Sequence, residues 1–169
     1  MKISIDKMVA KGMKSPEESA LKGYKILGGS KEKKDCVLLY EESKELKLRI
    51  TFTVVSEGKV IYYTAVQENK QGSAMPKKSE EEKERIIYFC FMANKRLPEG
   101  FLEFDANGNR ISFKSQIVLD RDDNEIARDL ERGVICGRIA LYRAAQLVGY
   151  LKNTCKTDEE VQDLAKLMY

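Results

Sequence analysis

One stretch near the start of the chain alternates strictly between apolar and polar residues, which predicts a β-strand. Residues 46–54 read LKLRITFTV, so that the apolar side chains share one face and the polar side chains share the other. A period of two is typical of a strand with one buried face. Shorter runs at residues 36–40 and 60–66 predict strands on either side of it. The short polar connections between the three indicate an antiparallel meander.

Helical spacing replaces this alternation in two other stretches. Ser15-Pro16 has the form of a helix start, and an apolar stripe ends at Leu27 before Gly28-Gly29, which predicts a first helix. Ser79 with Glu82 forms a capping box at the start of a second helix, which we expect to run to Leu97. This second helix is apolar around much of its circumference.

The part of the chain after the second helix predicts a hairpin followed by one long helix. The hairpin reads FLEFDANGNRISFKSQIVL, and Asn107-Gly108 suits the positive φ angles of its turn. Asp120 to Glu125 supplies carboxylates for the start of a helix that runs to about Leu151. Thr157 with Glu160 caps a last short helix.

Together these elements predict an α+β fold in the order α-β-β-β-α-β-β-α-α. We expect one twisted antiparallel sheet of about five strands with helices on one face. The predicted domain organisation is an N-terminal segment at 1–14 and a single α+β domain at 15–169, a length that can bury a core without disulfides.

Composition narrows the classes of partner. The net charge of +3 is too small for the electrostatic footprint of a nucleic-acid-binding protein. No segment has the run of about 18 apolar residues that a membrane span needs, and the first residues lack the apolar core of a secretory signal. We therefore expect a cytoplasmic protein with no membrane partner.

Residue types argue against catalysis. The chain contains no histidine, which removes the usual general base and makes a transition-metal site improbable. The four cysteines form no C-x-x-C pair; Cys155 is the one expected to be exposed, because it lies in a polar joint. We predict no catalytic residues, no cofactor and no metal.

Two acidic groups could suggest a metal site, and in both a structural role is favoured. Asp105, Asn107 and Asn109 have the spacing that opens a calcium loop, but the glycine is misplaced and a hairpin turn explains them better. The carboxylates of residues 120–125 are explained by helix capping.

The second helix carries the first candidate interface, at Ile87, Tyr88, Phe91 and Met92. These residues lie off the core stripe, and a helix that is apolar nearly all round is usually buried on two sides. The second side could be covered by a partner or by the long third helix, and both alternatives stay open.

Two further surfaces are candidates. The long helix has small residues three or four apart, namely Gly133, Gly137, Ala140 and Ala144. Because glycine is costly inside a helix, close packing of another backbone is expected there, with the domain's own sheet favoured over a dimer contact. The polar face of the sheet is the other candidate, with Lys47, Arg49, Tyr62 and Tyr63.

The order of an apolar helix, ERIIYFCFMANKRL, the hairpin and a long helix ending in ALYRAAQLVGYL resembles the YbjN-like family of bacterial proteins, which is associated with sensory-transduction regulation. The resemblance covers roughly residues 15–151. It implies a type III secretion chaperone-like fold, frequent dimerisation and a role in binding proteins. We therefore predict a non-enzymatic, chaperone-like or regulatory protein-binding module that forms a homodimer. The alternative is a small-ligand-sensing domain with a pocket between sheet and helices.

Overall fold

The computed structural model describes residues 25–28, 36–42, 47–55, 60–67, 78–107, 109–118 and 121–168. Within these residues, six strands form one antiparallel sheet in the order β1-β2-β3-β4-β6-β5. Their bounds are Lys25–Gly28 for β1, Cys36–Glu42 for β2, Lys47–Val55 for β3, Val60–Gln67 for β4, Phe101–Asp105 for β5 and Arg110–Val118 for β6. The chain is therefore a meander from β1 to β4, to which the hairpin β5–β6 adds with β6 inside.

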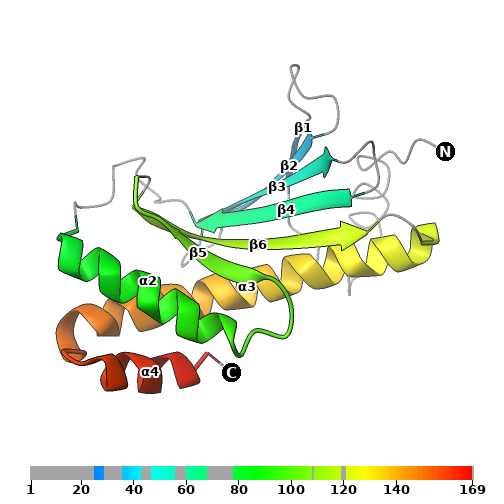
Figure 1. The fold of residues 1–169 in the computed structure, drawn as a ribbon. Helices are drawn as coiled ribbons and strands as arrows, with labels where there is room; N and C mark the ends of the chain where they lie inside the picture. Colours follow the sequence, from blue (N-terminus) through cyan, green and yellow to red (C-terminus); the bar gives the residue numbers. More distant parts are fainter. Residues whose placement is uncertain are drawn as a thin grey trace.

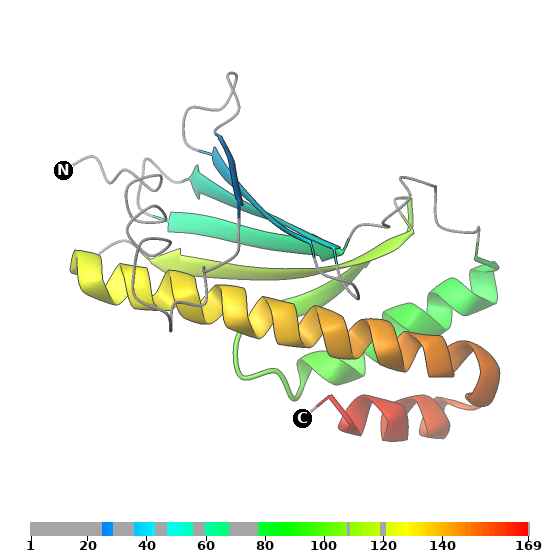
Figure 2. The same cartoon turned by 180° about the vertical axis from the view of Figure 1, so that it is seen from behind.

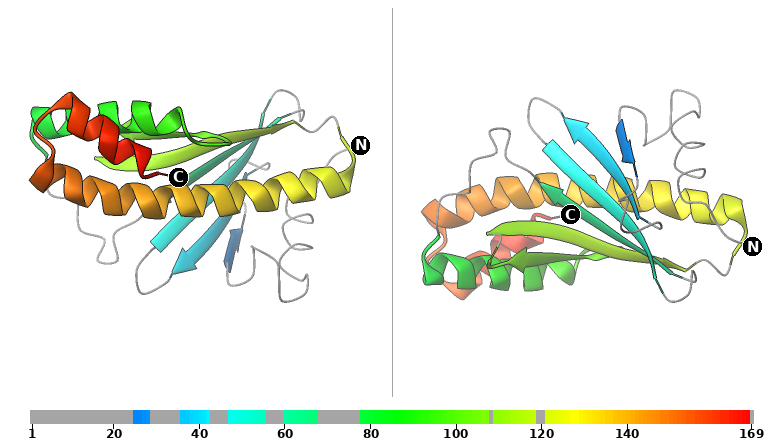
Figure 3. Two further views of the ribbon diagram at one scale, coloured as in Figure 1. Left: turned by 90° about the horizontal axis from the view of Figure 1, so that it is seen from below. Right: turned by 90° about the horizontal axis from the view of Figure 1, so that it is seen from above.

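The helices of the described residues cover one face of this sheet (Figures 1 and 2). They are α2 at Glu80–Asn94, α3 at Asp123–Thr154 and α4 at Asp158–Lys166. Helix α3 contacts β6 and β4, whereas α2 contacts β5. Figure 3 shows that α3 crosses the strands obliquely, while α4 lies against α2 in a layer farther from the sheet.

The prediction of five strands was wrong, because the sheet has a sixth strand, β1. Leu27 and Gly28 were expected at the end of a helix, yet they lie in β1, whose Ile26 pairs with Leu39 of β2. Strand β2 would otherwise present an unpaired edge, and pairing with a neighbouring segment satisfies its backbone groups. This pairing overrides the helical spacing of the segment. The rest of the predicted first helix and the segment 1–14 lie outside the described residues.

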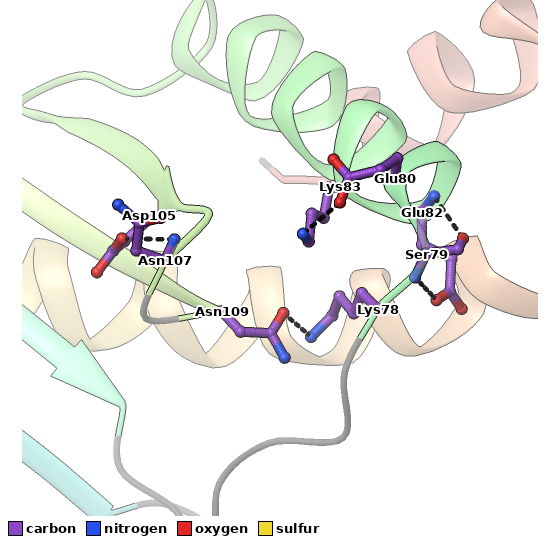
Figure 4. A network of polar contacts seen from close by, with 8 residues as sticks. All are labelled: Lys78, Ser79, Glu80, Glu82, Lys83, Asp105, Asn107 and Asn109. Carbon is purple, nitrogen blue, oxygen red and sulfur yellow. Dashed lines mark hydrogen bonds and ion pairs between the residues drawn. The ribbon is translucent and has the colours of Figure 1, made fainter.

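The helix starts follow from local sequence. Ser79 Oγ accepts a hydrogen bond from the backbone N–H of Glu82 at 3.1 Å, and Glu82 Oε2 accepts one from that of Ser79 at 2.9 Å (Figure 4). Thr157 and Glu160 form the same reciprocal pair at α4. Both predicted capping boxes are confirmed. Helix α2 ends at Asn94, however, before Leu97.

The core lies between the sheet and the helices. Its largest fully buried side chains are Leu48, Ile50, Phe89, Phe113, Ile126, Leu130, Leu141 and Met168. On β3, buried Leu48 and Ile50 flank exposed Arg49, as alternation requires. Burial of each large apolar side chain contributes roughly 1.5–3 kcal/mol, so these residues fix the helices on the sheet.

Gly100 lies in the connection between α2 and β5, directly before the first residue of β5. Its φ of 68° lies in the left-handed region, and a Cβ there would come within 2.4 Å of Phe113 Cζ and 2.6 Å of the Lys114 carbonyl oxygen. Only glycine has both the backbone freedom and the small volume for this position.

Candidate functional site

The apolar second side of α2 is divided between a covered part and an exposed part. Tyr88 and Met92 are half-buried, and the Tyr88 hydroxyl accepts a hydrogen bond from Gln162 Nε2 of α4 at 2.5 Å. Helix α4 thus covers much of this side of α2. The two alternatives considered from the sequence were a partner and the long third helix, and α4 was neither of them. Tyr88 and Met92 are thus partly covered by α4, and whether a partner also contacts them stays a prediction.

Ile87 and Phe91 remain on the surface. Their side chains lie one turn apart on α2 and are 50% and 58% exposed. The Lys95 ammonium lies 4.8 Å from the centre of the Phe91 ring, within the range of a cation–π contact. Two large apolar side chains and a cation therefore share this face of the helix.

A basic groove adjoins this face between the carboxyl ends of α2 and α4. It has a volume of about 400 Å³ and is lined by Met92, Lys95, Arg96, Gln162, Ala165 and Lys166. Lys166 Nζ pairs with Asp163 Oδ1 at 2.6 Å. Within the described part of the chain, neither Lys95 nor Arg96 forms an ion pair with a carboxylate. Cations at helix carboxyl ends are stabilised by the helix dipole, so Lys95 and Arg96 keep the groove positively charged although Lys166 is paired with Asp163.

Lys95, Arg96 and Lys166 are not among the interface residues predicted from the sequence. The basic pair at 95–96 directly follows an apolar helix and could have been found as a cationic flank of the candidate interface. Lys166 could not, because only the docking of α4 against α2 brings it to the same groove.

The small-residue stripe of α3 is internal. Gly133 and Gly137 are buried, and Ala140 and Ala144 are 1% and 0% exposed. Helix α3 contacts β6 and β4. The stripe is therefore covered within the molecule, and a second copy could not reach it without unfolding the domain.

The candidate sheet face is described in part. Arg49 is exposed on β3. The side chains of Lys47, Tyr62 and Tyr63 lie outside the described part of the structure; their backbones belong to β3 and β4, where Tyr62 pairs with Thr53 and Tyr63 with Phe52.

The acidic groups have structural roles. Asp105 Oδ1 accepts from the backbone N–H of Asn107 at 3.0 Å in the hairpin turn (Figure 4). Asp122 Oδ1 accepts from the backbone N–H groups of Asn124 and Glu125 and so caps α3. Among the described residues, no cluster of cysteine and carboxylate side chains could hold a metal ion.

Of the cysteines whose side chains the structure describes, Cys90 and Cys155 are buried and Cys136 is half-buried. Burial raises the pKa of the Cys90 thiol to about 12, and burial together with the nearby Glu99 raises the pKa of Cys136. Cys155, which was expected to be exposed, is buried. Its carbonyl oxygen accepts a hydrogen bond from Arg85 Nη1 at 3.0 Å, which holds the α3–α4 joint against α2.

No helix of the described residues has both the length and the apolar character to cross a bilayer. In comparisons with known proteins, no family model, no curated protein and no solved structure matches the chain. The resemblance to the YbjN-like family therefore stays a prediction.

Proposed function

We propose that this protein is a non-enzymatic protein-binding module that uses one face of α2. We define the α2 docking surface as Ile87, Phe91, Lys95, Arg96 and Lys166. The observation that carries the proposal is the exposure of Ile87 and Phe91 beside a groove whose cations Lys95 and Arg96 have no carboxylate partner among the described residues.

The chemistry of this surface indicates the class of partner. Buried aromatic anchors contribute much of the affinity at protein interfaces, and Phe91 is available for that role. Cations beside the anchors favour acidic residues and raise the association rate. The partner that fits is an acidic segment with apolar side chains at helical spacing, which would lie along α2 and place its carboxylates over the groove.

Binding by this surface is tested with paired variants in affinity capture from the native host. Phe91→Asp should abolish capture of a specific partner, because it puts a carboxylate at the anchor position. Arg96→Glu should weaken capture and reduce its dependence on salt. Val118→Asp is the matched control, since Val118 is 44% exposed on β6 and belongs neither to α2 nor to the groove. Retention of the same partner by Phe91→Asp would place the interface elsewhere.

We also propose that the protein forms a homodimer through α3. The support is a stripe of exposed apolar side chains on this helix, with Ile135 39% and Ile139 43% exposed. In light scattering at micromolar concentration, the wild type and Phe91→Asp should have the mass of a dimer and Ile139→Asp that of a monomer. A monomeric wild type would reject the proposal.

A reducing compartment, and hence the cytoplasm, is the proposed location. The support is that Cys90, Cys136 and Cys155 are free thiols, whereas oxidising compartments favour disulfides.

A further inference from the structure

Helix α4 has the same chemistry as the partner that is proposed for the α2 docking surface. Its first turn is acidic, with Asp158, Glu159 and Glu160. Its apolar side chains follow at helical spacing, and Val161 and Ala165, one turn apart, are both buried. Helix α4 packs mainly against α2. The molecule therefore already places one acidic, amphipathic helix on the apolar side of α2.

Helix α4 lies along α2 over most of its length. At its start, the Cys155 carbonyl oxygen accepts a hydrogen bond from Arg85 Nη1 at 3.0 Å. Farther along, Gln162 Nε2 donates to the Tyr88 hydroxyl at 2.5 Å. The carboxyl ends of both helices then meet at the basic groove, and Figures 1 and 3 show the two helices side by side. Helix α4 therefore occupies the length of α2 that a partner helix needs.

Within the described residues, α4 has few contacts outside α2. Its contacts with α3 are fewer than those with α2. A hydrogen bond of 3.0 Å also joins Arg143 Nη1 of α3 to the Leu167 carbonyl oxygen, at the end of α4. The helix has nine residues, and isolated helices shorter than about 12–15 residues are marginal in water. Helix α4 is therefore stable only while it is docked, and a segment of the same chemistry can compete with it for α2.

The face of α2 that α4 covers is continuous with the α2 docking surface. Tyr88 and Met92 are half-buried against α4, whereas Ile87 and Phe91, which precede them directly in the sequence, are exposed. A helix that rests only on Ile87 and Phe91 buries one narrow strip. A helix that takes the place of α4 also buries Tyr88 and Met92, and the exclusion of water around such anchors is what gives an interface most of its affinity.

We propose that α4 occupies the binding position of the partner helix and that the partner binds by displacing α4. The proposal rests on the proposed function of the α2 docking surface. The partner, an acidic amphipathic helix, contacts Tyr88 and Met92 in addition to Ile87 and Phe91. Displacement takes Lys166 away from the surface and leaves its α2 residues in place. Docked α4 reduces the apparent affinity in proportion to the fraction of molecules in which α2 is open, so that changes which loosen α4 strengthen binding.

A peptide with the sequence of residues 156–168, KTDEEVQDLAKLM, is the probe, added to the full-length protein and followed by amide NMR. Val161→Asp in the protein puts a carboxylate into the buried contact of α4 and should undock the helix. The peptide should bind this variant at least about tenfold more tightly than the wild type and shift the amide signals of Tyr88 and Met92. A peptide that carries the same Val161→Asp change should not bind. Absence of binding to the variant protein would overturn the proposal.

If Val161→Asp does not fold, Thr157→Ala decides. Thr157 is exposed, and its hydroxyl accepts a hydrogen bond from the Glu160 N–H at 3.3 Å, so the change weakens the start of α4 and leaves α2 as it is. Thr157→Ala should bind the peptide about fivefold more tightly than the wild type, which is the factor that loss of a helix cap implies. Val118→Asp on β6 is the matched control and should bind it as the wild type does. Equal binding by Thr157→Ala and the control would overturn the proposal.

Failure of the displacement and failure of the docking surface give different results. Phe91→Asp combined with Thr157→Ala should bind the peptide as Thr157→Ala alone does, because Phe91 is exposed beside α4. Thr157→Ala should also capture more of the native partner than the wild type. Unchanged capture by Thr157→Ala would overturn the displacement and leave the docking surface standing. Retention of the partner by Phe91→Asp would reject the docking surface, whereas stronger capture by Thr157→Ala would still support the displacement of α4.

Discussion

The side-chain amide of Asn94 pairs with both backbone groups of Leu102. Asn94 Nδ2 donates to the Leu102 carbonyl oxygen at 2.9 Å, and Asn94 Oδ1 accepts from the Leu102 N–H at 2.7 Å. Strand β5 is at the edge of the sheet, so these groups would otherwise have no strand to pair with. The Asn94 side chain thus makes the two hydrogen bonds that a neighbouring strand would otherwise make with Leu102, and it links the end of α2 to β5.

Loss of this amide should lower stability. Asn94→Ala leaves a part-buried donor and acceptor without their partner, at a cost of about 1–3 kcal/mol in the free energy of unfolding. Asn94→Asp should cost a similar amount, because it keeps the acceptor but places a carboxylate against the Leu102 carbonyl oxygen. Urea denaturation measures both. Asn124→Ala is the control, since Asn124 is exposed, and an Asn94→Ala variant no less stable than this control would refute the role.

Opposite effects are expected for alanine at two glycines. Gly100→Ala should destabilise the protein by roughly 2–5 kcal/mol, from the left-handed backbone and from overlap with Phe113. Gly149→Ala should stabilise it by up to about 1 kcal/mol, since its Cβ enters open space within a helix. Thermal unfolding of the two variants checks the signs. Similar melting temperatures for both would contradict the geometry around Gly100.

Local signals explain what could be predicted of the fold. Ser79 and Thr157 each start a helix through contacts that span three residues, so the sequence alone contains the whole interaction. The same holds for the hairpin around Asn107. Strand β1 could not be found in this way, because it exists only through pairing with β2, and the spacing of its residues also suits a helix.

The sequence predicted which apolar residues of α2 lie off the core stripe, but not which of them are exposed. The helical spacing shows that Ile87, Tyr88, Phe91 and Met92 lie off the core stripe, but it cannot show which of them a neighbour covers. That depends on how the short helix α4 folds back on α2, which brings Gln162 to Tyr88 across the intervening chain. Non-local docking of this kind leaves no periodic pattern in the sequence.

The buried thiol of Cys90 should make stability depend on pH in the alkaline range. Its pKa is about 12 in the fold and 9.0 in the reference state, so above about pH 9 the unfolded chain releases a proton that the folded chain keeps. Stability should therefore fall as pH rises from 9 towards 12, by up to about 1.4 kcal/mol per pH unit from this group.

Cys90→Ala isolates this contribution, because lysines and tyrosines titrate in both proteins. Urea denaturation between neutral pH and about pH 10 should show a loss for the wild type that exceeds the variant's by on the order of 1 kcal/mol. The native thiol should also resist alkylation in mildly alkaline solution. Equal pH dependence in the two proteins, or rapid alkylation without unfolding, would show that Cys90 is not buried as described.

Helix α4 should loosen selectively in acid because of Glu160. The carboxylate accepts hydrogen bonds from the backbone N–H groups of Lys156 at 2.6 Å and Thr157 at 3.0 Å, and these bonds lower its pKa from the usual 4.5. A lowered pKa stabilises the fold above the ordinary value, and this contribution is lost as pH falls through the folded value. Glu160→Gln should therefore weaken the start of α4 at neutral pH and remove this step of its acid response.

An NMR titration that follows the Tyr88 ring reports whether α4 stays docked on α2. A Glu160 midpoint at or above 4.5, or a Tyr88 signal that responds to acid equally in both proteins, would contradict this role.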